Sequence, residues 1–111
     1  MSSTLEGLVE RLLDDNEGVR WGAAEALGRL GDPRAVEPLI DTLWDDDARV
    51  RLKAAWALGM LGDPRALAPL QKLYRIERED ARETIREAMD MIKEAMGEAM
   101  MGDRNGAGPS L

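Results

Sequence analysis

Two clusters of carboxylates are the first groups in this 111-residue chain that could do chemistry. The stretches LDDNEGVR, at 13–20, and WDDDARVR, at 44–51, each gather acidic side chains, which a divalent metal ion prefers as ligands. A calcium loop also needs alternating oxygen ligands, a glycine and a distal glutamate, and this pattern is missing. Both clusters stand where helices are expected to start, and acidic residues there cap backbone N–H groups. We therefore predict helix caps, with no metal and no other cofactor.

The residue types that most often carry out catalysis are absent from the chain. It has no histidine and no cysteine, so it lacks an imidazole base, a thiol nucleophile and a thiolate metal ligand. Nothing in the sequence indicates a pair of carboxylates tuned for acid–base work. We therefore predict that this protein is not an enzyme.

Charge and hydropathy restrict the partners and the location. The formal net charge of −7 argues against a groove for nucleic acid and against binding to an anionic membrane. The start of the chain, MSSTLEGLVERLLDD, lacks the basic and apolar regions of a signal peptide. No apolar run approaches the ~18 residues that a membrane span needs. We expect a cytoplasmic protein.

The elements that position these residues come in a repeat. Residues 14–44 and 45–75 align without gaps, and 17 of the 31 positions are identical, which is typical of stacked-repeat proteins. Each copy predicts two helices. In the first copy, one helix runs from about residue 17 to 30, Gly31 ends it as a left-handed cap, and Asp32-Pro33 starts the next. The shared apolar stripe of the first helix predicts a packed face: Val19, Ala23, Ala26, Leu27 and Leu30.

The repeat pattern continues past both ends of the two full copies. Residues 5–13 match a second helix, and residues 79–92 match a first helix. We predict one repeat domain over 1–101, made of a half repeat (4–14), two repeats (14–44 and 45–75) and a half repeat (76–101). A disordered tail, 102–111, is expected to follow. The fold class is therefore all-α, a short α-solenoid of about six helices.

Arg20 and Arg51 occupy the same position in the two copies. A repeated arginine near repeated aspartates predicts salt bridges between repeats or hydrogen bonds to helix ends. Anion binding is the alternative.

The repeat motif, D-x-x-V-R-x-x-A-A-x-A-L-G-x-L-G-D-P-R-A-V-x-P-L, resembles the short HEAT-like repeats of phycobilin lyases and of many small prokaryotic proteins. The resemblance covers residues 5–92 and implies a superhelix of HEAT-like helical hairpins. It does not imply lyase activity, since the repeat is a building unit of unrelated proteins. Phycobilin lyases are much longer and attach a chromophore together with partners. Deoxyhypusine hydroxylase, another HEAT-repeat enzyme, holds iron with His-Glu motifs, which this histidine-free chain lacks.

Positions that differ between the copies form a second stripe on the first helices, opposite the shared one. Because packing fixes the shared stripe, we expect the differing stripe to face solvent. It carries fewer charges than a solvent face usually does. We call it the first-helix stripe; its members are Trp21, Gly22, Glu25, Arg29, Leu52, Lys53, Trp56 and Met60, continued by Glu83, Thr84, Glu87 and Met91.

The first-helix stripe predicts an apolar patch centred on Trp21, Leu52, Trp56 and Met60, with an acidic border. Exposed tryptophan and methionine mark interaction surfaces. Gly22, in the middle of a helix, is interpreted as a notch beside Trp21. The alternative is that Trp56 and Leu52 lean sideways and fill the seam between repeats.

The stripe leads to a hypothesis about function. We predict a non-catalytic protein–protein interaction or scaffold module that docks a helix or loop of an unknown protein partner on the stripe, with Glu25, Lys53 and Glu83 setting its orientation. The alternative is a homo-oligomer, such as a homodimer, that buries its own apolar stripe or its Met-rich C-terminal helix. A third hypothesis, an accessory subunit like those of chromophore lyases, rests on the resemblance alone.

Overall fold

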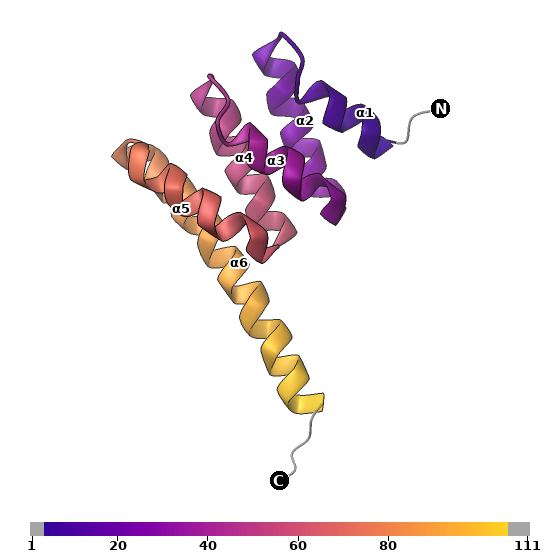
Figure 1. Cartoon of the computed structure of the whole chain (residues 1–111), viewed down its shortest axis with the longest axis vertical. Coiled ribbons are helices and arrows are strands. Elements are labelled where there is room, and N and C mark those ends of the chain that lie inside the picture. The colour runs from indigo at the N-terminus through magenta and orange to yellow at the C-terminus, as the bar shows by residue number, and fades with distance from the viewer. Residues whose placement is uncertain (1–3, 107–111) are drawn as a thin grey trace.

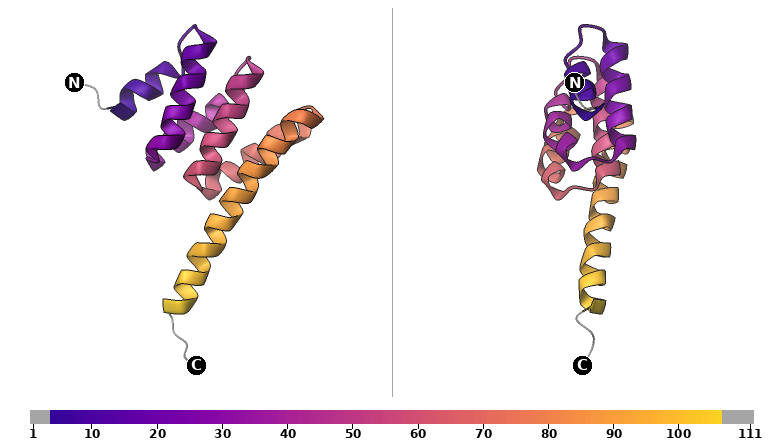
Figure 2. Two further views of the ribbon diagram at one scale, coloured as in Figure 1. Left: turned by 180° about the vertical axis from the view of Figure 1, so that it is seen from behind. Right: turned by 90° about the vertical axis from the view of Figure 1, so that its right-hand side faces the viewer.

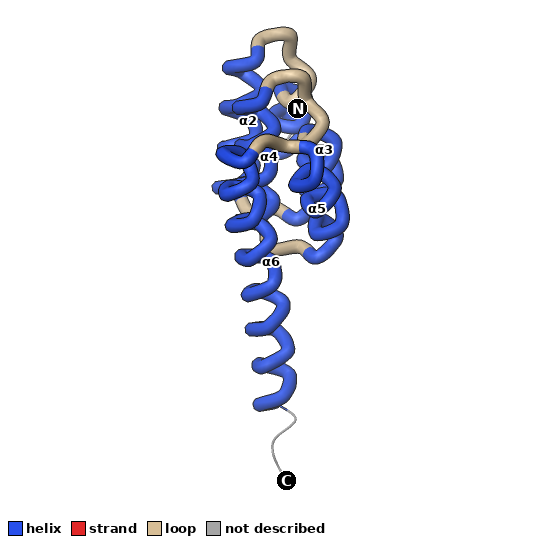
Figure 3. The backbone as a smooth tube through the Cα atoms, turned by 90° about the vertical axis from the view of Figure 1, so that its left-hand side faces the viewer, coloured by secondary structure: helices blue, strands red, loops and turns tan. Residues whose placement is uncertain are grey.

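The computed structural model describes the backbone of residues 4–106 and the side chains of residues 4–98. Within this part, helices alternate between two layers and no strand occurs, which confirms the predicted α-solenoid (Figure 1, Figure 3). One layer holds the first helices of the repeats: α2 (Glu17–Leu30), α4 (Ala48–Leu61) and α6 (Glu79–Gly106). The other holds the second helices: α1 (Thr4–Arg11), α3 (Val36–Thr42) and α5 (Leu67–Ile76).

The first helices start and end where their sequences require it. Asn16 caps α2 by accepting a hydrogen bond from the Val19 N–H (3.1 Å), and Asp47 caps α4 in the same way through Val50 (3.3 Å). Gly31 and Gly62 end these helices with φ angles of 74° and 68°, a left-handed conformation that glycine adopts without a steric penalty. Their backbone N–H groups bond carbonyls of the last turn. The acidic clusters therefore act as caps.

The sequence Asp-Pro-Arg forms a 3₁₀ turn in both copies, η1 (Pro33–Ala35) and η2 (Pro64–Ala66). The Asp32 carboxylate accepts hydrogen bonds from the backbone N–H of Arg34 (2.9 Å) and from its guanidinium (2.8 Å). Asp63 makes the same pair of bonds with Arg65. The second helices α3 and α5 thus each follow a capped 3₁₀ turn, whereas the sequence predicted one α-helix starting at Asp-Pro.

These turns predict a dependence of stability on pH. Hydrogen bonds from the arginine side chains hold the pKa values of Asp32 and Asp63 below their ordinary value of 3.8. A carboxyl group whose pKa is lower in the folded state stabilises the fold above its unfolded pKa, and this contribution is lost as the pH falls through the folded pKa. We expect the melting temperature to fall between about pH 5 and pH 2, and to fall less in the Asp32→Asn/Asp63→Asn variant.

Thermal melts followed by circular dichroism at a series of pH values test this expectation. The control is Asp41→Asn, because Asp41 is exposed and caps no helix. It should keep the wild-type pH dependence. Parallel curves for all three proteins would contradict the role given to the turns.

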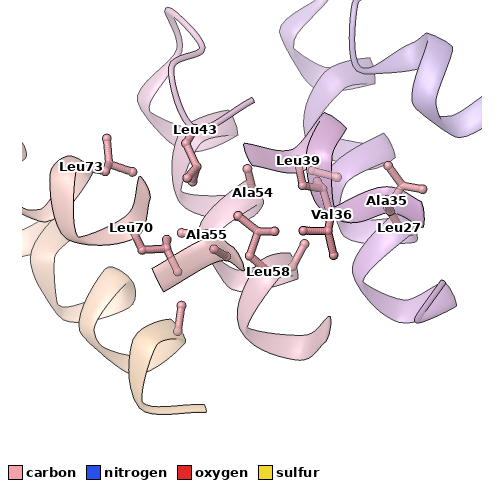
Figure 4. Close-up of a cluster of buried hydrophobic side chains, with 14 of the residues drawn as sticks. Leu27, Ala35, Val36, Leu39, Leu43, Ala54, Ala55, Leu58, Leu70 and Leu73 are labelled. Carbon is pink, nitrogen blue, oxygen red and sulfur yellow. The ribbon is translucent and has the colours of Figure 1, made fainter. Parts of the chain in front are cut away.

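The core lies between the two layers and is built from aliphatic side chains (Figure 4). Leu27 and Leu58 from the first helices and Leu39 and Leu70 from the second helices have no exposed surface. Alanines fill the remaining positions in the first helices, where the backbones come close together. The repeated Ala and Leu positions of the sequence are therefore the packing positions.

The first helices cross at two equivalent glycines, Gly28 and Gly59. A Cβ atom at Gly28 would lie 2.8 Å from the Trp56 ring and 3.0 Å from the Ala57 Cα. A Cβ atom at Gly59 would lie 2.9 Å from the Ala88 Cα. Backbone atoms this close leave no room for a side chain, so both junctions depend on glycine.

The repeated arginines connect successive repeats, as predicted. The Arg20 Nε donates to the Asp45 carboxylate at 2.8 Å, and its Nη1 donates to the Asp14 carbonyl at 2.7 Å. One repeat later, Arg51 donates to the Glu77 carboxylate at 2.7 Å and to the Asp45 carbonyl at 2.9 Å. Each guanidinium thus joins the loop before its own helix to the loop before the next first helix. The salt-bridge interpretation is confirmed.

Two residues of the predicted packed stripe are exposed at the N-terminal end of the solenoid. Val19 is 36% exposed and Leu30 is 47% exposed, although Val50, the counterpart of Val19, is only 1% exposed. The reason is position: α4 packs between α2 and α6, whereas among the described residues no first helix precedes α2. The prediction that every shared apolar residue is packed is wrong for these two.

The last helix extends well beyond the repeats. α6 continues to Gly106, and Figure 2 shows it running past the other helices. Residues 102–106, expected to be a disordered tail, are therefore helical, because extending an existing helix is much easier than starting one. Residues 107–111 of that prediction lie outside the described residues. No helix of the described part is long and apolar enough to cross a membrane.

Candidate interaction surface

The first-helix stripe contains one compact cluster of side chains. The Lys53 ammonium lies 4.6 Å from the centre of the Trp21 ring and 4.5 Å from the centre of the Trp56 ring. Lys53 and Trp56 are one turn apart on α4, and Trp21 comes from α2. A cation so close to two ring faces is attracted by both. The two tryptophans are therefore joined through one lysine.

The two cations of this cluster share one carboxylate. The Glu25 carboxylate lies 3.1 Å from the Arg29 Nε and 3.6 Å from the Lys53 Nζ. The Arg29 guanidinium also lies 5.8 Å from the centre of the Trp56 ring. Glu25 and Lys53, predicted to orient a partner, thus have partners within the chain. Their effect is to fix the positions of the rings.

The apolar members of the stripe differ in exposure. Trp21 is 39% exposed and Met60 is 48% exposed, whereas Leu52 and Trp56 are partly buried and pack against the core. The Trp56 ring reaches across to Gly28 on α2. Leu52 and Trp56 therefore fill the seam, as the alternative hypothesis expected, and Trp21 and Met60 form the open part of the patch.

A hollow adjoins Trp21. It has a volume of about 510 Å³ and lies between the N-terminal turns of α2 and α4, where Gly18, Val50 and Arg49 line it. Gly22 does not line this hollow, and a Cβ atom added to it would meet no atom within 4 Å. The notch beside Trp21 is thus formed by the gap between helix starts and not by Gly22.

The acidic border on α6 stands apart from the cluster. Glu83 and Glu87 are exposed, and the Glu83 carboxylate lies 2.6 Å from the Arg86 Nη1 on its own helix. Arg86 in turn lies 6.0 Å from the centre of the Tyr74 ring. The structure brings together the stripe residues of α2 and α4, while Glu83 and Glu87 of α6 belong to a separate charged face and the Met91 sulfur lies against Gly59 of α4. No group of three acidic side chains that could hold a metal ion occurs among the described residues.

Three exposed apolar residues were missed by the sequence analysis because they lie at the ends of second helices or in the loops that follow them. Leu13 is 86% exposed, Trp44 is 45% exposed and Ile76 is 71% exposed. The repeat contained a signal. Ile76 stands where the two full copies have Asp14 and Asp45, so an apolar residue replaces a carboxylate that accepts a hydrogen bond from the backbone N–H two residues later.

Comparisons with known proteins agree with this architecture. The chain resembles a structure of human deoxyhypusine hydroxylase in complex with glycerol, with a TM-score of 0.72 and 26% identity. The match covers 96% of this chain and 35% of that chain, so the chain spans about a third of the length of the hydroxylase. No curated protein matches the sequence. The family model for HEAT repeats matches residues 5–90, and the chain belongs to this family.

Proposed function

We propose that this protein is a non-catalytic interaction module that docks a helix or loop of a partner protein on the first-helix stripe. The proposal rests chiefly on the Lys53 ammonium held between the Trp21 and Trp56 rings, 4.6 and 4.5 Å from their centres. We also propose a cytoplasmic location, and repeats of the phycobilin-lyase type on the basis of their motif.

Rigid aromatic groups support a role in binding. Ordering a flexible side chain at an interface costs about 0.5–1.5 kcal/mol. The Trp21 ring is already positioned by Lys53, so a partner would meet an ordered surface. Tryptophan is also among the residues that contribute most to binding energy at interfaces. Trp21 is the expected anchor, with the adjoining hollow as the place for a partner side chain.

Catalysis has little support from the residues present. The hydroxylase that the chain resembles is nearly three times as long, since the match covers 35% of it. This chain also has no histidine or cysteine. For these reasons we carry the fold over from the hydroxylase, and not its activity.

Affinity capture with matched variants tests the docking proposal. The bait proteins are the wild type, Trp21→Ala/Met60→Ala and the control Trp44→Ala, in which an equally exposed tryptophan is removed from the other layer. We expect the captured amount of at least one protein to fall about 10-fold with the double variant, as for the loss of a binding hot spot. With the control, the captured amount should not change. Capture of the same proteins in the same amounts by all three baits would contradict the proposal.

A homo-oligomer that buries the stripe is the second candidate, supported by the exposure of both Trp21 and Met60. Light scattering on a sizing column over a wide range of concentration distinguishes it. A dimer that Trp21→Ala/Met60→Ala dissociates would favour this candidate over the first. An accessory role with a chromophore would instead require binding of free bilin, visible as quenching of tryptophan fluorescence.

A further inference from the structure

The second-helix layer carries a groove that the first-helix stripe does not include. The groove has a volume of about 390 Å³ and lies between α1 and α3. Val9, Leu12 and Leu13 line one wall, and Pro38 and Trp44 line the other. This volume is within the range of about 300–1,000 Å³ that is usual for ligand pockets, so it can receive a bulky apolar side chain.

The groove is apolar along its walls and acidic at its border. Glu37, Asp41 and Asp45 line it, and no lysine or arginine does. Asp45 is bound to Arg20 and Glu37 to Arg65. The Asp41 carboxylate has no hydrogen bond or ion pair among the described residues. The groove therefore presents an apolar floor with one carboxylate available for a cation.

A corner of the same molecule carries an exposed apolar side chain beside two arginines. Ile76, 71% exposed, ends α5 between Arg75 and Arg78, both of which are exposed. Neither guanidinium forms a hydrogen bond or ion pair within the described part of the chain. The glutamate between them, Glu77, is held by Arg51, and Glu79 and Asp80, in the first turn of α6, subtract two charges from the corner. The corner is thus an exposed isoleucine with two available cations.

Groove and corner lie along the same edge of the solenoid. The loops that follow α1, α3 and α5 all project at this edge (Figure 1). A two-fold axis perpendicular to the edge would bring the corner of each copy to the groove of the other. Such a contact is self-complementary and closes after two copies.

We propose that a second copy of this chain docks along this edge, with Ile76 of each copy in the groove between Leu13 and Trp44 of the other. Arg75 or Arg78 then meets Asp41 across the contact. Two apolar contacts and two sets of opposite charges are made in each dimer. The groove lies between second helices, whereas Trp21 and Met60 lie on first helices, so this dimer is separate from the stripe-mediated one considered above.

Sedimentation velocity tests the proposal. The protein concentration runs from about 1 μM to 1 mM, because weak self-complementary contacts have dissociation constants in this range. We expect the mass to rise from 12.2 kDa towards twice that value. Ile76→Asp and Trp44→Ala should each weaken the dimer at least about 10-fold, while Trp21→Ala should leave it unchanged. Because these positions are exposed, unchanged circular dichroism melts will show that the variants are folded.

A mixing experiment tests the groove-to-corner pairing itself. Ile76→Asp retains an intact groove, and Trp44→Ala retains an intact corner. A mixed dimer has one contact with both sides intact and one with both sides changed. Because Ile76 and Trp44 would touch each other, losing both at one contact costs less than the two separate losses added, so the mixed dimer should be more stable than either variant's own dimer. A monomer at every concentration, a dimer indifferent to Ile76→Asp, a dimer dissociated by Trp21→Ala, or no gain on mixing would each overturn the proposal.

Discussion

Replacing Leu58 with alanine is expected to lower the free energy of unfolding by about 3–5 kcal/mol. Leu58 has no exposed surface. It lies on α4, which is in the middle of the first-helix layer and packs against both α2 and α6. The substitution removes three buried carbon atoms and leaves a cavity. Because α4 is packed against both α2 and α6, these helices cannot move together to fill it. A domain of this size has a stability of about 5–15 kcal/mol, so a large part of it would be lost.

Urea denaturation followed by circular dichroism measures this loss. The matched control is Leu30→Ala, the same substitution near the end of α2, where the leucine is 47% exposed. We expect the control to lose less than about 1 kcal/mol, because little apolar surface is buried there. Similar losses for both variants would show that α4 is not the centre of the core.

Gly28→Ala is expected to lower the free energy of unfolding by up to about 2 kcal/mol. Alanine gains about 1 kcal/mol over glycine in a helix, but overpacking a tight contact costs about 1–3 kcal/mol and sometimes more. The new Cβ atom would lie 3.0 Å from the Ala57 Cα, which belongs to a helix backbone and can move only with the whole of α4. Gly59→Ala should behave alike, because its Cβ atom would meet the Ala88 Cα at 2.9 Å.

Gly22→Ala is the control for both substitutions. Gly22 lies in α2 with Gly28, and its added Cβ atom would meet nothing within 4 Å. Only the helix preference remains, so this variant should be more stable than the wild type by about 0.5–1 kcal/mol. The three melts together separate helix preference from packing. A stabilising Gly28→Ala would mean that the first helices approach less closely than the structure has them.

The repeat made the fold predictable because its signals are local. Gly31 with Asp32-Pro33 marks where one helix ends and the next begins, and the first helix was predicted from about 17 to 30, the bounds of α2. Arg20 and Arg51 could be assigned to inter-repeat bonds because both the arginine and the aspartates repeat. A 3₁₀ turn after Asp32 was not predicted, since a single turn has the same sequence signals as a helix start.

The candidate surface was predictable only as a set of positions. Helical spacing placed Trp21, Lys53 and Trp56 on one stripe, but the position of the lysine between two rings depends on how α2 and α4 cross. The exposure of Val19 was also not predictable from its letter, because Val50 has the same letter and is buried. The two valines differ in exposure because α2 lies at the end of the first-helix layer and α4 lies in its middle. The sequence shows that Ile76 departs from the repeat, but it does not predict that Ile76 belongs to an exposed surface.

The glycine crossings also determine how the solenoid bends. Within the first-helix layer, α2 packs on α4 and α4 packs on α6, each through one glycine junction, whereas α2 and α6 do not pack on each other. Two such joints act in series, so their flexibilities add and neither restrains the other. The Trp21–Lys53–Trp56 cluster spans the first joint alone. A ligand that binds both tryptophan rings would fix the angle between α2 and α4, and it would leave the angle between α4 and α6 unrestrained.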